Sequence, residues 1–264
     1  MSGRIITMKS SEDFEKMAVA GACVAAVHDA VRAASIPGTR MRELDAVAAD
    51  VIRSRGCRSS FLGYHGTFPA TICTSPNHVI VHGIPGDYRL REGDVLSIDA
   101  GAIYEGWHGD AAFTMAIGDV APEVTRLLEV TEEALWNGIA AARHGNRLGD
   151  VGSAVEATAR PYGYGVVREY IGHGIGRQMH EAPEVPNYGQ PGKGMKLKRG
   201  MAIAIEPMFN MGTAETAVLD DGWTVVTRDG GLSAHFEHTV AITSEGPKVL
   251  TLEEPMLVDT LSPA

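Results

Sequence analysis

The chain has 264 residues, of which 44% are hydrophobic and 21% charged, a composition typical of a globular protein that excludes a disordered or fibrous one. Lys and Arg number 23 against 33 Asp and Glu, and the resulting formal charge of −10 argues against a nucleic-acid partner, which requires a basic face. No apolar run approaches the roughly 20 residues that span a bilayer and no signal peptide opens the chain, so we expect a cytoplasmic protein with no membrane partner.

Two helices are predicted near the start of the chain, where apolar residues recur at helical spacing. The first begins after Ser10, a candidate N-cap with Asp13 three positions on, and ends before Pro37-Gly38. The second covers residues 41–52 and ends before Gly56. The same plan returns in the second half of the chain, which predicts helices over residues 123–143 and 148–155.

A fixed offset of 107 residues relates the two halves. It aligns Gly38 with Gly145 and Gly56 with Gly163, and it carries the buried-looking run 94–99 onto 201–206. One such match could arise by chance between segments of similar composition. Several matches in one register indicate an internal duplication.

The duplication predicts an α+β fold with pseudo-twofold symmetry, because each half has helices followed by strands. We expect antiparallel sheets that meet at the centre, with helices packed outside. Residues 1–264 would form a single catalytic domain whose two halves cover about residues 10–118 and 119–250.

Two Asp residues border strand-like segments of the first half, although Asp is rare in strands. Asp99 ends the run 94–99, and Asp110 precedes an apolar run, with turn-forming glycines between the two. A hairpin that turns at Tyr104-Glu105 would place the two side chains opposite each other, roughly 4.5–5.5 Å apart at Cβ. Like charges at that distance repel unless a cation lies between them or one carboxyl is protonated.

The second half offers two Glu residues in corresponding places. Glu206 matches Asp99, whereas Glu237, in the strand-like run 234–240, matches Asp110 only if about twenty residues are inserted, at 212–231. Each acid alone could be a rim residue or an ion-pair partner. Four acids at a symmetry axis need compensating positive charge, and with one imidazole they can hold two divalent metal ions.

The imidazole is expected from His173, because the glycines at 172, 174 and 176 let the backbone approach a site closely. A hydrogen-bonded core histidine is the alternative there and at His65, its counterpart in the first half. His82 and His180 are either site residues or surface and cap histidines. The remaining histidines are expected to be structural or solvated: those at 28, 78, 108, 144, 235 and 238.

Taken together, these motifs resemble those of the methionine aminopeptidases of the short bacterial type I form, within the creatinase-like "pita-bread" metallopeptidases. The resemblance covers essentially the whole chain. It rests on Gly63-Tyr64-His65-Gly66, His82-Gly83-Ile84-Pro85, Ser97-Ile98-Asp99, His108-Gly109-Asp110, Gly172-His173-Gly174-Ile175-Gly176, Ile205-Glu206-Pro207 and Phe236-Glu237-His238-Thr239.

The resemblance implies the pita-bread fold and removal of the initiator Met from new proteins when the next residue is small. It implies two divalent metal ions (Co, Mn, Fe, Zn or Ni) that lower the pKa of a water for attack on the peptide bond. By motif match, the five metal ligands would be Asp99, Asp110, His173, Glu206 and Glu237.

The resemblance also implies three catalytic side chains. His180 would stabilise the oxyanion, His82 would face the scissile amide and Glu206 would move a proton to the leaving amine. The Met side chain would lie in a pocket, for which plain core packing is the alternative reading, formed by Tyr64, Phe68, Cys73 and Trp223.

Two departures from the family pattern leave the shape of the pocket open. The segment Thr67-Phe68-Pro69 is one residue longer than usual, and Met179 stands where relatives often have an aromatic residue.

The implied partners are N-terminal methionyl peptides of nascent proteins and, transiently, the ribosome, and we expect a monomer. One alternative is another aminopeptidase of the same fold, specific for Xaa-Pro peptides. A catalytically silent binding protein on this fold is the other, although such a protein should have lost ligands and all five positions are occupied here.

Overall fold

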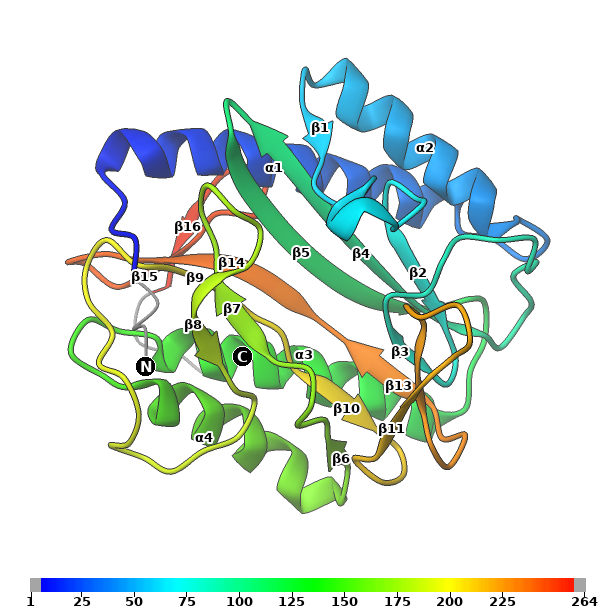
Figure 1. Cartoon of the computed structure of the whole chain (residues 1–264). Coiled ribbons are helices and arrows are strands. Elements are labelled where there is room, and N and C mark those ends of the chain that lie inside the picture. Colours follow the sequence, from blue (N-terminus) through cyan, green and yellow to red (C-terminus); the bar gives the residue numbers. More distant parts are fainter. Residues whose placement is uncertain (1–5, 259–264) are drawn as a thin grey trace.

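The computed structural model describes residues 6–258 and places a curved sheet between two pairs of helices (Figure 1). Helix α1 (Ser11–Ala34) packs against β4 (Val95–Tyr104) and β5 (Trp107–Ala116), and α2 (Met41–Ser54) packs on α1. In the second half, α3 (Pro122–Ala141) contacts α4 (Leu148–Ala159) and the strands of its own half. Each half thus has two helices outside its strands.

The four predicted helices are present, with ends that the sequence marks. Ser10 caps α1 through the backbone N–H of Asp13, whose carboxylate accepts from the backbone of Ser10 in return. Pro122 opens α3, a position that suits a residue without an N–H. Helix α4 is followed by a short 3-10 helix, η2 (Arg160–Tyr162), which contains Pro161.

Over residues 6–258, the central sheet has ten strands and runs without interruption through both halves. Its main path is β1-β4-β5-β14-β9-β7-β8, and the halves join where β5 pairs antiparallel with β14. The other members of this sheet are β1 (Arg58–Ser59), β2 (Cys73–Pro76), β7 (Gly172–Gly174), β8 (Glu181–Val185), β9 (Ala202–Ile205), β14 (Glu237–Ile242), β15 (Pro247–Val249) and β16 (Met256–Leu257).

Two three-stranded sheets flank the central one. The first contains β13 (Ser233–His235), β10 (Met208–Asn210) and β6 (Gly165–Val166). The second contains β11 (Thr216–Val218), β12 (Val225–Thr227) and β3 (Val79–Val81). Strands β11 and β12 lie within the predicted insertion at 212–231.

The prediction of a single strand over residues 234–240 is wrong, because the structure has two strands there, β13 and β14. The predicted strand is divided at Phe236, because β13 pairs with β10 in one sheet whereas β14 pairs with β5 and β9 in another. The chain changes sheets at this residue.

The hairpin between β4 and β5 turns one residue later than predicted. Tyr104 pairs with Trp107, so Glu105 and Gly106 form the two-residue turn, both with positive φ, 48° and 80°. Such a turn matches the twist of the strands and favours Gly at its second position. The later turn shifts the register by two, so that Asp99 and Asp110 are diagonal rather than direct neighbours.

The offset of 107 residues recurs in the backbone geometry, which confirms the duplicated fold class. Gly38 and Gly145 have φ of 95° and 98°, and each donates its N–H to a leucine carbonyl, of Leu90 and Leu197 respectively. The isolated bridges Arg40–Arg89 and Arg147–Lys196 are related by the same offset. We propose that the halves of this single domain divide near residue 118, between β5 and α3.

Helix α1 contradicts the expectation that no apolar segment is long enough to span a bilayer. Within residues 6–258 it alone is long and apolar enough to cross a membrane by composition, with a mean hydropathy of 1.3 in its most apolar window. Its apolar side chains pack in the protein core instead, where Met17, Val24, Val27 and Val31 are buried. A helix that covers a sheet needs the same composition.

Candidate active site

One row of side chains crosses the centre of the large sheet. Cys73 on β2 pairs with Asp99 on β4, Asp99 with Ala112 on β5, and Ala112 with Glu237 on β14. Cross-strand partners point to the same face of a sheet. The small side chain of Ala112 therefore lies between the carboxylates of Asp99 and Glu237 and leaves space between them.

The other two acids lie beside this row. Asp110 pairs with Gly101, two residues from Asp99 along β4, and thus shares the face of the row. Ile205 at the end of β9 pairs with His238, so the next residue, Glu206, arrives beside Glu237. The sequence prediction that two acid pairs meet where the halves join agrees with this register.

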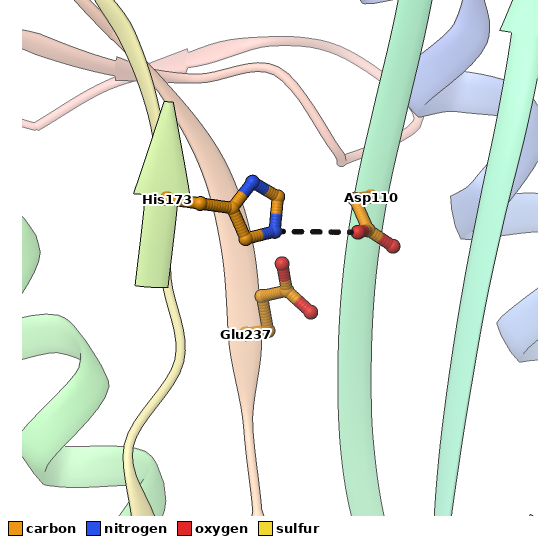
Figure 2. A group of neighbouring side chains, drawn as sticks. All are labelled: Asp110, His173 and Glu237. Atoms are coloured by element: carbon orange, nitrogen blue, oxygen red, sulfur yellow. Dashed lines mark ion pairs between the residues drawn. The ribbon is translucent and has the colours of Figure 1, made fainter. Parts of the chain in front are cut away.

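His173 reaches the acids from β7, on the far side of β9. Its Nε2 lies 3.9 Å from Oδ2 of Asp110 and 3.7 Å from Oε1 of Glu206. One ligand atom from each of Asp110, His173 and Glu237 lies within 4.8 Å of the others, and Figure 2 shows these three side chains converging. Such a group can hold a metal ion.

The glycines around His173 allow its strand to lie this close. A Cβ on Gly172 would be 2.3 Å from the carbonyl oxygen of Ala204, and one on Gly174 would be 2.1 Å from that of Ala182. Only glycine fits at either position. The Gly-His-Gly motif is therefore explained by close packing of β7 between its neighbours.

His173 presents a lone pair to the acids. Its Nδ1 is 2.9 Å from the carbonyl oxygen of Gly174, which can only accept, so Nδ1 carries the proton of the neutral ring. Burial lowers the pKa of His173 to about 3, and the ring is neutral at pH 7. The contact drawn in Figure 2 thus joins two acceptors, Nε2 and a carboxylate oxygen, as a shared cation requires.

The acids have the electrostatics of a site that needs a positive charge. Burial, and then the charge of the neighbouring acids, raises the pKa values of Asp110, Glu206 and Glu237 well above normal, and burial raises that of Asp99 to about 7. Buried oxygens of Asp99, Asp110 and Glu237 have no hydrogen-bond partner among residues 6–258. A divalent metal ion fits both observations, because it supplies positive charge and accepts oxygen ligands.

All eleven site residues predicted from the sequence line a single cavity of about 490 Å³. The four acids and His173 described above form one wall. The apolar wall contains Tyr64 on η1 (Tyr64–Gly66), Phe68, Cys73 and Trp223, and His82 and His180 also line the cavity. The apolar side chains pack together: the rings of Phe68 and Trp223 are 5.2 Å apart, edge to face.

His180 lies next to the acids and is held by an aromatic hydroxyl. Its ring is 4.1 Å from that of His173, and its Nδ1 is 2.6 Å from the hydroxyl oxygen of Tyr64. When Tyr64 donates this hydrogen bond, the proton of the neutral imidazole is on Nε2. His180 then has a free N–H donor inside the cavity.

His82 follows β3 and has a left-handed backbone, with φ of 60°. Such a conformation is strained for a residue with a side chain and is most often kept where a site requires it. The next residue, Gly83, has no room for a Cβ, which would be 2.2 Å from the carbonyl oxygen of Thr74. Burial lowers the pKa of His82 to about 4, so its ring is neutral at pH 7.

Sequence reasoning missed some members of the site. Phe61 and His65 line the cavity, as does Met179, which stands where relatives often have an aromatic residue. His235, expected to be structural, is buried with Nε2 unpartnered among residues 6–258 and 3.8 Å from Oε2 of Glu206. The sequence signal that could have placed His235 in the site was its position two residues before Glu237.

Comparison with known proteins identifies the class that this fold and site define. Residues 15–244 match metallopeptidase family M24, and the chain belongs to that family. It is therefore a metal-dependent hydrolase of peptides.

Relatives that match nearly the whole chain are named methionine aminopeptidases. Methionine aminopeptidase 1 of Mycobacterium tuberculosis (strain CDC 1551 / Oshkosh) is 51% identical to this chain over 256 residues. The match covers 94% of this chain and 96% of that protein. Methionine aminopeptidase 1 of Bacillus subtilis (strain 168) is 45% identical over 247 residues, covering 94% and 99%. These matches confirm the resemblance seen in the sequence.

Solved structures confirm the pita-bread fold. The crystal structure of methionine aminopeptidase from Thermotoga maritima has a TM-score of 0.92 and 40% identity, and the match covers 94% of this chain and 100% of that one. Prolidase from Pyrococcus furiosus has a TM-score of 0.75 and 26% identity, covering 94% of this chain and 66% of that one.

Proposed function

We propose that this protein removes the N-terminal methionine from peptides and nascent proteins whose second residue is small. The observation that carries the proposal is one cavity with two unlike walls. An acid cluster suited to metal ions forms one wall, and an apolar pocket forms the other. The names of the relatives support the same activity.

The metal centre would contain two divalent ions. Asp99, Asp110, His173, Glu206 and Glu237 would hold them, and cobalt, manganese, iron, zinc and nickel all suit carboxylate and imidazole ligands. When bound, such ions supply Lewis acidity and make a water nucleophilic near neutral pH.

His180 would stabilise the charge that develops on the carbonyl oxygen of the scissile bond. The contact with Tyr64 leaves Nε2–H free to donate, and a positioned donor of this kind is worth about 10²–10³-fold in rate. His82, neutral and in the same cavity, would face the scissile amide.

Glu206 would move the proton. It lies on the wall of acids, with a side chain 13% exposed, where it can accept a proton from the attacking water and pass it to the leaving amine. His235 lies beside it, with Nε2 3.8 Å from Oε2 of Glu206.

The apolar wall would take the methionine side chain. Phe68, Cys73 and Trp223 offer the rings and the thiol that suit a flexible thioether, and Phe61 and Met179 extend this surface. Burial raises the pKa of the Cys73 thiol well above normal, so it stays a neutral, apolar group.

We propose that the enzyme works in the cytoplasm as a monomer, with transient contact at the ribosome where its substrates emerge. Nucleic acid is not expected as a direct partner, because the chain is acidic. A membrane is not expected either, because the apolar side chains of α1 are buried in the core.

The test is metal-dependent release of methionine. The purified enzyme, stripped with a chelator and reloaded with Co²⁺, Mn²⁺ or Fe²⁺, should cleave Met-Ala-Ser and leave a matched Met-Leu-Ser peptide nearly intact. Metal analysis should give two equivalents. Preferential cleavage of Xaa-Pro peptides would replace this function with that of the prolidase-like relatives, and absence of turnover with every metal would favour a silent binding protein.

A further inference from the structure

The loop that bears His180 is attached to the N-terminal segment by a buried ion pair. Nζ of Lys9 lies 2.9 Å from Oε2 of Glu181, the residue after His180, and the two side chains are 2% and 7% exposed. Lys9 also donates to the hydroxyl of Thr7, at 2.6 Å, and Thr7 donates to Glu181. The second carboxylate oxygen of Glu181 accepts the backbone N–H of Gln178, at 3.1 Å.

This arrangement explains the last glycine of the Gly172–Gly176 motif. A Cβ on Gly176 would lie 2.6 Å from Cε of Lys9 and 2.8 Å from Oε1 of Glu181. Any side chain there would push the two charges apart. Gly176 thus leaves the space through which the lysine reaches the loop.

Both ends of the attachment are fixed to the central sheet. The backbone N–H of Lys9 donates to the carbonyl oxygen of Gly200, at 2.7 Å, and the N–H of Gly200 donates to Ile242 at the end of β14. The N–H of His108 on β5 donates to the carbonyl of Gly176, at 2.9 Å. The lysine therefore links a rigid frame to the short loop between Gly176 and Glu181.

A buried ion pair contributes little to stability, since desolvation of both charges offsets their attraction. What a fully hydrogen-bonded pair does provide is one fixed geometry. Here the ion pair fixes the position of Glu181, and Glu181 directly follows His180 in the chain. A change of about 1 Å in a group at a reacting centre can lower the rate by about 10²-fold.

We propose that Lys9 is a positioning residue for His180: through Glu181, and with Thr7, it holds the loop so that the imidazole faces the scissile carbonyl. This inference rests on the proposed aminopeptidase function. Lys9 itself does not line the cavity and touches no reacting group.

The first experiment compares Lys9→Met with wild type. We expect kcat to fall by about 10- to 100-fold, with KM and bound metal unchanged, because the carbonyl contact matters mainly in the transition state. Lys16→Met is the matched control: Lys16 forms ion pairs with Glu12 and Glu105 at the surface, and its loss should leave kcat unchanged. Thr7→Val, which leaves both charges in place, should lower kcat in the same direction by less.

A double variant tests whether Lys9 acts through His180. In a His180→Ala background, Lys9→Met should cause no further loss of kcat, whereas a general effect on folding would lower it again. A Lys9→Met enzyme with wild-type kcat, or one that loses metal, would overturn the positioning role. A wild-type enzyme that releases no methionine would instead overturn the proposed function, so the two failures are distinguishable.

Discussion

Replacement of a metal ligand should stabilise the metal-free protein. Asp99 is a carboxylate in a cluster of acids, and burial raises its pKa from 3.8 to about 7. Between these two values the folded protein retains a proton that the unfolded chain has released. The free energy of unfolding therefore decreases as pH rises through this window, and the loss is complete above pH 7.

The size of the effect follows from the shift. A rise of about three units, at about 1.4 kcal/mol for each unit, corresponds to about 4 kcal/mol of lost stability above pH 7. Asp99→Asn has no proton to lose and avoids this penalty. We expect the variant and wild type to be equally stable near pH 4, and the variant to be more stable by up to about 4 kcal/mol at pH 8.

Urea denaturation from pH 4 to pH 8, with a chelator present, measures this difference. The buried histidines are the same in both proteins, so their own pH dependence cancels. With saturating Mn²⁺ the advantage of Asp99→Asn should shrink, because metal at about 100 times its Kd stabilises wild type by about 2.7 kcal/mol. A difference that does not grow with pH, or a less stable variant at pH 8, would refute the electrostatic reasoning.

Three further variants test the other roles. Asp110→Ala should lose bound metal and activity together, measured by metal analysis and peptide assay, and retained metal would exclude Asp110 as a ligand. His180→Ala should lower kcat by about 10²–10³-fold with metal still bound, and loss of metal would disprove its role as a donor. His235→Leu should weaken Mn²⁺ binding in equilibrium dialysis by about 10- to 100-fold, because it removes the neighbour of Glu206, whereas His235→Gln retains an N–H and serves as the control.

Much of the fold was predictable because its determinants are local. Helical spacing and the Ser10 cap define α1, and the repeated glycines at an offset of 107 residues reveal the duplication before any contact is known. The hairpin turn was missed because the prediction required Asp99 and Asp110 to be directly opposite. The preference for Gly at the second turn position, met by Gly106, was the better guide.

The acid cluster was predictable because a carboxylate in a buried strand is rare and four of them repeat. The row of side chains from Cys73 to Glu237 could not be predicted, because it depends on the register of four strands from distant parts of the chain. The contact of Lys9 with Glu181 spans 172 residues and has no local pattern. Both features follow from tertiary packing alone.

The pairing of β5 with β14 has a consequence for synthesis of the protein. The acids of the first half stand on β4 and β5, and Glu237 is the first residue of β14. A chain that ends before β14 contains Asp99 and Asp110 but lacks the strand that brings Glu237 beside them. The proposed metal site is therefore complete only after translation has passed Glu237.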